Sequence, residues 1–83
     1  MHTKTIQNLP TTNDVTVIHE FGYNPVASPL RGTENRHAIT AFYRDGTLNA
    51  LFATRPGQGH QRIDGDLTSA LAALIEEFEA LDA

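Results

Sequence analysis

Cysteine is absent from this chain of 83 residues, which removes two common ways of stabilising a small domain. Disulfide bonds and thiolate zinc sites both require cysteine. A chain this short forms one domain, and its core rarely contributes more than about 3 to 5 kcal/mol. We therefore expect a single domain over residues 1–83 that gains stability by self-association, for which a homodimer is the simplest form.

Long apolar runs are also absent. No segment approaches the roughly 18 apolar residues that a membrane-spanning helix needs. Residues 1–10 lack the apolar stretch of a secretory signal peptide. We expect a cytoplasmic protein without a membrane partner.

Basic residues are absent from the last part of the chain. Residues 64–83 contain six acidic and no basic residues, whereas residues 1–63 contain six basic and four acidic ones, so their formal charges are −6 and +2. Contacts to phosphate need Lys or Arg. The C-terminal segment is therefore poorly suited to nucleic acid, which could bind only the rest of the molecule.

Residues 38–55 contain the strongest local pattern, two strand-like runs around Asp45-Gly46. Asp-Gly favours a two-residue type I′ turn, because both central positions need a positive φ. A regular register from this turn places three apolar pairs on one face, Tyr43 with Leu48, Ala41 with Ala50 and Ile39 with Phe52. The opposite face would then carry Phe42 and Leu51.

The flanking segments complete the predicted fold. Residues 15–21 are rich in β-branched residues and predict a strand, residues 1–14 a loose arm and residues 22–35 a long loop. Asp66, or Thr68 if the helix starts later, can cap a C-terminal helix whose apolar positions recur every three or four residues: Leu67, Ala70, Leu71, Leu74, Phe78 and Leu81. The prediction is an α+β fold in which this amphipathic helix packs on one face of a three-stranded, mostly antiparallel sheet.

Patterns for catalysis, metals and cofactors are weak. The four histidines lack the i, i+4 spacing of helical zinc pairs, and no nucleophile-elbow pattern surrounds a serine. Residues 57–62 contain two glycines but lack the Lys-Ser or Lys-Thr of a phosphate-binding loop. We expect no catalytic, cofactor-binding or metal-binding residues and a protein that is not an enzyme.

Two surfaces are candidates for binding. The acidic face of the helix carries Glu76, Glu77, Glu79 and Asp82. Carboxylates near a helix C-terminus oppose the helix dipole, so they form either a solvated face or a surface for a protein with a basic patch.

The second candidate is the sheet face away from the helix, with Phe42, Leu51 and Arg44. One face of such a sheet needs a cover, which the long loop, a second subunit or another partner could provide. Aromatic side chains close to Arg36, Arg44 and Arg55 could also stack on nucleic-acid bases.

The order of strand, Asp-Gly turn, strand, Pro56-Gly57, and then Gly65-Asp66 with a helix containing Ala70-Leu71 resembles the HicB-type antitoxins. The resemblance covers residues 38–81, and it implies a small ribonuclease-H-like sheet with one helix that neutralises a toxin by direct contact. The chain departs from that family in a shorter Asp66–Ala70 segment and a long polar connection over residues 56–65. In size and charge it is also similar to small acidic inhibitors from phages and mobile elements, anti-CRISPR proteins among them.

Together these patterns predict a small non-catalytic protein-binding module that inhibits or regulates another protein. The alternative is a nucleic-acid-binding module that uses the open sheet face and its arginines.

Overall fold

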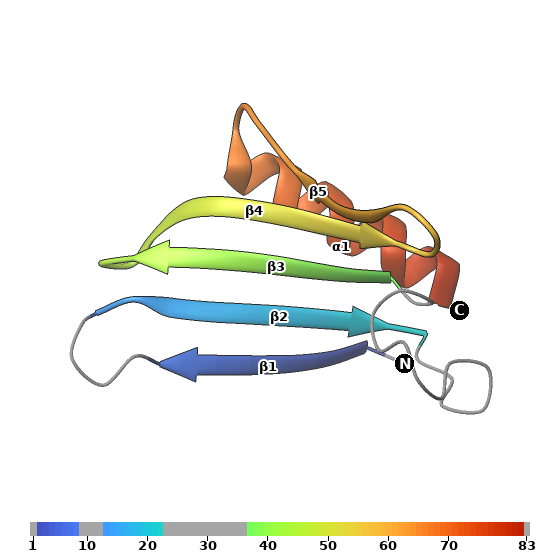
Figure 1. Ribbon diagram of the computed structural model, residues 1–83, viewed down its shortest axis with the longest axis horizontal. Helices are drawn as coiled ribbons and strands as arrows, with labels where there is room; N and C mark the ends of the chain where they lie inside the picture. The colour runs from blue at the N-terminus through green and yellow to red at the C-terminus, as the bar shows by residue number, and fades with distance from the viewer. Residues whose placement is uncertain (1, 9–12, 23–36, 83) are drawn as a thin grey trace.

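The computed structural model describes residues 2–8, 13–22 and 37–82, which form one antiparallel sheet and one helix (Figure 1). The elements are β1 (His2–Asn8), β2 (Val15–Phe21), β3 (His37–Arg44), β4 (Thr47–Arg55), β5 (Gly59–Arg62) and α1 (Leu67–Asp82). The strands lie in the sheet in the order of the chain. The predicted α+β class, with an antiparallel sheet and a C-terminal helix, is confirmed. The predicted number of strands is wrong, because the sheet has five.

The two unpredicted strands lie at the edges of the sheet. The segment expected to be a loose arm contains β1, and the polar connection before the helix contains β5. Every residue of both strands is exposed. Their backbones pair with β2 and β4, respectively, so they need no apolar alternation of their own. Beyond Gly22, the predicted loop over residues 22–35 lies outside the described residues.

The turn between β3 and β4 is the predicted type I′ turn. Asp45 and Gly46 both have positive φ, at 51° and 80°. The adjacent pairs, Arg44 with Thr47 and Tyr43 with Leu48, follow the predicted register.

The register then shifts by one residue. Phe42 pairs with Ala50 rather than with Asn49, so Asn49 is an extra residue in β4 and forms a β-bulge. Because side chains alternate between the faces of a strand, this insertion reverses the face of every following residue of β4 relative to the regular register.

The residues of β4 that follow the bulge lie on the faces opposite to those predicted. Leu51 and Ala53 lie in the core with an exposed fraction of 0%, whereas Ala50 and Phe52 point to the other face. The placement of Leu51 on the open face was therefore wrong. The predicted core positions of Ile39 and Ala41 are confirmed.

The helix begins at the earlier of the two predicted starts, with Leu67 as its first residue. The backbone N–H of Ser69 donates to Asp66 Oδ1 at 3.2 Å, and the Ser69 hydroxyl donates to Asp66 Oδ2 at 3.0 Å, so Asp66 is the N-cap. These hydrogen bonds to the carboxylate lower the pKa of Asp66.

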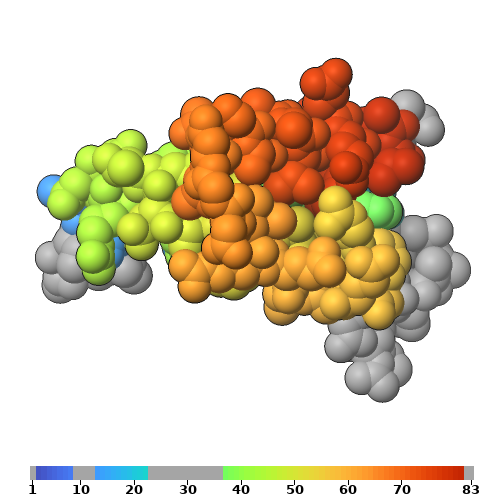
Figure 2. All heavy atoms as spheres, turned by 90° about the horizontal axis from the view of Figure 1, so that it is seen from above, coloured from blue at the N-terminus to red at the C-terminus, as the bar shows by residue number. Residues whose placement is uncertain are grey.

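The core lies between α1 and strands β2, β3 and β4. Its buried members come from four elements: Phe21, Ile39, Ala41, Leu51, Ala53, Leu74 and Phe78. Five of the six predicted helix positions contact or belong to this core, and Leu81 is 61% exposed. Figure 2 shows α1 along one side of the molecule and the β3–β4 turn, in yellow-green, projecting beyond the start of the helix. No helix in the described part of the chain is long and apolar enough to cross a membrane.

Candidate functional site

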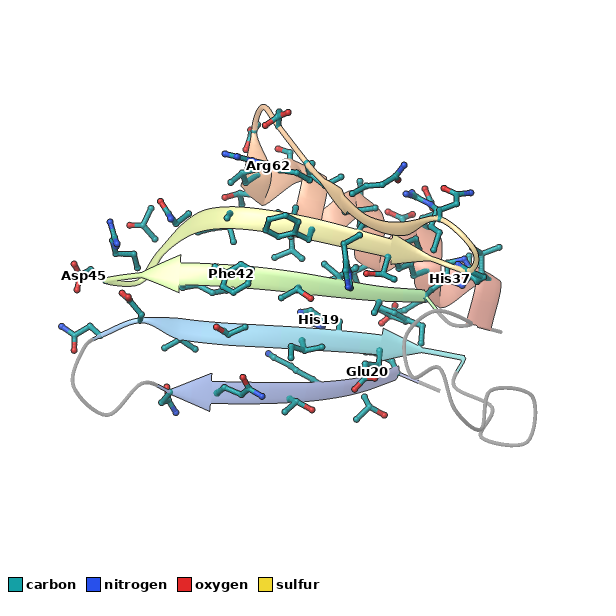
Figure 3. All side chains as sticks on the ribbon, viewed as in Figure 1. His19, Glu20, His37, Phe42, Asp45 and Arg62 are labelled. Atoms are coloured by element: carbon teal, nitrogen blue, oxygen red, sulfur yellow. The ribbon has the colours of Figure 1, made fainter. Side chains whose placement is uncertain are left out.

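The sheet has an outer face, which we define as the face opposite α1. Directly paired residues share a face, and the pairing places one row of side chains across all five strands on the outer face: Thr5, Ile18, Thr40, Phe52 and Arg62. The next row contains Gln7, Thr16, Phe42 and Ala50. Figure 3 marks Phe42 on the central strand β3 and Arg62 on β5.

Two aromatic rings lie together in the middle of the outer face. The rings of Phe42 and Phe52 meet edge to face, with centroids 5.8 Å apart and planes at 88°. This is a favourable geometry for an aromatic pair. Phe42 is nevertheless 38% exposed, and it is one of the exposed large apolar side chains among the described residues. Phe52 is half-buried. An aromatic pair with one exposed ring on a sheet face is a candidate contact surface.

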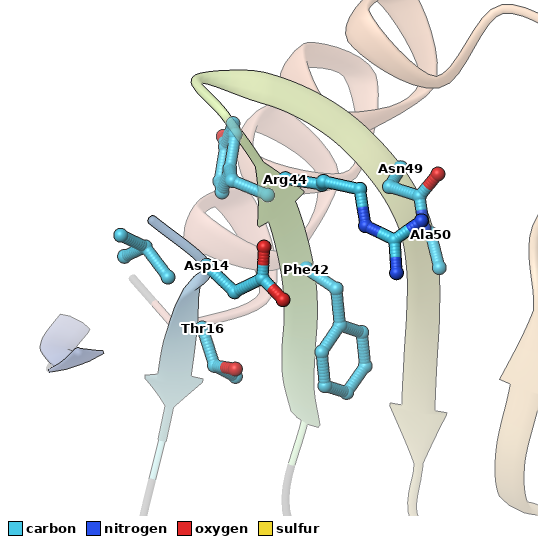
Figure 4. A pocket seen from close by; sticks show the side chains of 8 residues that line it. Asp14, Thr16, Phe42, Arg44, Asn49 and Ala50 are labelled. Atoms are coloured by element: carbon cyan, nitrogen blue, oxygen red, sulfur yellow. The ribbon is translucent and has the colours of Figure 1, made fainter. Parts of the chain in front are cut away.

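Phe42 separates two shallow hollows. The first has a volume of about 290 Å³ and lies between Phe42, Arg44 and Asp14 at the end of β3 (Figure 4). The second has a volume of about 340 Å³ and is lined by Thr40, Phe42, Phe52 and His60. In Figure 4 the side chains of Asp14, Phe42 and Arg44 lie on the side of the sheet away from α1. One hollow therefore has charged groups at its wall, and the other has two aromatic rings.

The arginines on the outer face differ from those expected from the sequence. Arg44 lines the first hollow, and Arg62 is paired with Phe52 across the strands. Arg62 contacts Asp64 only at 3.6 Å, with both side chains largely exposed. The guanidinium group of Arg55 instead lies on the helix side, 3.1 Å from the Glu77 carboxylate and 5.2 Å from the centre of the Phe78 ring. Arg36 lies outside the described residues.

The acidic face of α1 is partly engaged within the chain. Glu77 pairs with Arg55, and Glu79 accepts a hydrogen bond from His2 Nδ1 at 2.9 Å. Glu76 is exposed. The side chain of Asp82 is not among those that the structure describes. The helix itself has no basic residue, but His2 of β1 and Arg55 of β4 contact two of its three described carboxylates. No spacing in the sequence indicates these contacts.

His2, His19 and Glu79 form a chain of hydrogen bonds between β1, β2 and α1. His2 Nε2 and His19 Nδ1 are 2.9 Å apart, and the His2 ring stacks on Phe21 with centroids 4.3 Å apart. Because the carboxylate can only accept, His2 donates from Nδ1 to Glu79, and a neutral His2 then accepts the Nδ1 proton of His19. Burial, followed by the charges of His2 and Lys4, lowers the pKa of His19, and Glu79 partly opposes this shift.

We also considered Thr54 as a nucleophile and the His, Asp and Glu side chains as metal ligands. The Thr54 hydroxyl lies 2.6 Å from His60 Nδ1, but Thr54 is only 2% exposed, so its oxygen is not accessible to a substrate. In the described ranges, no three His, Asp or Glu side chains come together as metal ligands.

The structure therefore brings together only part of the predicted site. Phe42 and Arg44 share the outer face, Leu51 does not, and Phe52 was missed. No local motif marks the bulge at Asn49. The available signal was that Leu51 and Ala53 form an alternating apolar pair as well suited to the core as Ala50 and Phe52.

Neither a known family model, a curated protein nor a solved structure matches this chain. The resemblance to HicB-type antitoxins therefore stays an expectation from the sequence.

Proposed function

We propose that this chain is a non-catalytic protein-binding module that inhibits or regulates another protein, and that its contact surface is the outer face of the sheet. The observation that carries the proposal is the aromatic pair of exposed Phe42 and half-buried Phe52 between two hollows. Binding energy in protein interfaces concentrates in a few large side chains near the centre of the contact, and aromatic residues are enriched among them.

The hollows indicate the chemistry of the partner. The hollow lined by Thr40, Phe42, Phe52 and His60 suits an apolar side chain. Arg44 and Arg62 on the same face suit carboxylates around that side chain. The favoured partner is a protein surface with an apolar side chain at its centre and acidic groups around it.

The acidic helix face remains the second candidate surface for a protein with a basic patch. Glu77 and Glu79 would have to give up contacts within the chain to bind such a partner. This competition is the reason for ranking the outer face first.

Affinity capture followed by binding measurements with the purified partner tests the proposal. The Phe42→Ala, Phe52→Ala double variant should bind at least about 30-fold more weakly, because losing the centre of an interface costs about 2 kcal/mol or more. Glu76→Gln is the matched control on the opposite side of the molecule, and it should bind like the wild type. Unchanged affinity of the folded double variant would refute the assignment of the outer face.

Nucleic acid is the second candidate function, and Phe52 is the observation that favours it. The bulge gives the outer face two aromatic rings with arginines beside them, a combination that can stack on single-stranded bases. Retention on an oligonucleotide column that falls steeply with salt and disappears in Phe42→Ala, Phe52→Ala would support this function over protein binding.

A further inference from the structure

The strand β1 is an edge strand, and all seven of its residues are exposed. Among the described residues it pairs only with β2, and no described strand lies on the other side of its backbone. We propose that β1 pairs in an antiparallel manner with β1 of a second copy of this chain. The two-fold axis passes between the two copies of Thr5, which lie opposite each other. The contact joins the two five-stranded sheets into one.

The sequence of β1 determines this register. Pairing centred on Thr5 keeps all seven residues of His2–Asn8 opposite a partner residue. It places Lys4 opposite Ile6, and Thr3 opposite Gln7, so no like charges face each other. Centring on Lys4 would place two ammonium groups opposite each other, and centring on Ile6 would leave His2 and Thr3 unpaired.

Ile6 provides a reason for the contact. Its side chain is 55% exposed, although it lies on an otherwise polar strand. In the proposed pair, the aliphatic stem of Lys4 from the second copy lies across from Ile6 and covers part of it. A lysine in an edge strand usually discourages pairing. Here Lys4 excludes only the register in which the two copies of Lys4 face each other.

The strand is held in place before association. His2 at one end of β1 donates a hydrogen bond to Glu79, is 2.9 Å from His19 and stacks on Phe21. An edge that is already ordered loses less conformational entropy on binding.

The opposite edge of the sheet explains why the assembly stops at two. The strand β5 has four residues, begins with Gly59 and is shorter than β1. Short edge strands are poor templates for pairing. The contact between two copies of β1 uses the same surface on both subunits, so it closes as a dimer rather than growing into a fibre.

Single cysteine variants test the register, since the natural chain has no cysteine. In Thr5→Cys the two thiols face each other across the axis, so mild oxidation should produce a covalent dimer. The matched control is Thr3→Cys, which exposes the same chemistry on the same face of the same strand. Its two copies lie four positions apart along the strands, about 13 Å, which is too far for a disulfide.

Charge substitutions test the same contact without a covalent bond. Thr5→Glu and Thr5→Lys should each be monomeric in light scattering, and an equal mixture of the two should restore the dimer. The variant Phe42→Ala, Phe52→Ala should remain dimeric, which distinguishes this contact from self-association through the outer face. A wild-type chain that is monomeric up to its solubility limit, or equal cross-linking of the two cysteine variants, would overturn the proposal.

Discussion

Leu51 and Phe52 are adjacent in the sequence and lie on opposite faces of the sheet. The leucine is fully buried against the helix, and the phenylalanine contacts Phe42 on the outer face. A regular continuation of the hairpin would exchange these environments. The one-residue bulge therefore decides whether Phe52 or Leu51 faces a partner on the outer face.

The different environments of Leu51 and Phe52 can be measured by the free energy of unfolding that each loses on truncation to alanine. Leu51→Ala should lower the free energy of unfolding by about 2 to 5 kcal/mol, because it leaves a cavity in the core. Phe52→Ala should cost less than half as much as Leu51→Ala, because its ring lies on the outer face. Urea denaturation of both variants gives the comparison, and the reverse order would mean that β4 has the regular register.

His19 should make the stability depend on pH. Burial lowers its pKa in the folded chain from the ordinary 6.5, so below that pH the unfolded chain binds more protons than the folded one. The contribution of neutral His19 is complete above about pH 6.5 and is lost progressively as the pH falls toward the lower, folded pKa.

The measurement is the difference in urea midpoint between pH 7.5 and pH 5.5 for the wild type and His19→Gln. The wild type should lose more stability than the variant on acidification. Equal losses would show that His19 is not the group responsible, since the other histidines are present in both proteins.

Among the elements, the β3–β4 hairpin and α1 were predictable because each has a strong local signal. Asp45-Gly46 determines the turn, and Asp66 with the three- and four-residue apolar spacing determines the start and face of the helix. The strands β1 and β5 have no such signal. They are polar and exposed, and their strand conformation comes from the backbones of β2 and β4 beside them.

The turn can be tested at Gly46. Its φ of 80° is unfavourable for a residue with a Cβ, although a Cβ there would meet no heavy atom within 4 Å outside Gly46 and its two chain neighbours. Gly46→Ala should therefore destabilise the fold by about 1 kcal/mol through the backbone alone. Asp45→Asn is the control, because Asn tolerates the left-handed conformation and should leave the urea midpoint nearly unchanged.

The candidate site was less predictable than the elements around it. Phe42 and Arg44 were placed on the correct face because they lie on β3, and the extra residue of the bulge is in β4. Phe52 and Leu51 were exchanged because the bulge has no local motif. The contacts of Glu77 and Glu79 join residues that are far apart in the chain, so spacing could not reveal them.

For the whole molecule, the sheet separates two chemically different sides. The helix side holds the core and carboxylates that are partly paired with Arg55 and His2. The outer side holds the aromatic pair, with Arg44 and Arg62 on the same face. We propose that a partner binds the outer side.

Site-specific photo-cross-linking tests this assignment most directly. Benzoylphenylalanine would replace Phe52 on the outer side in one variant and Glu76 on α1 in another, and both would be irradiated in cells that express the protein. We expect a discrete cross-linked protein from position 52, absent when Phe42→Ala is added, and none from position 76. A discrete product from position 76 with none from position 52 would contradict the account and return the acidic helix to first place.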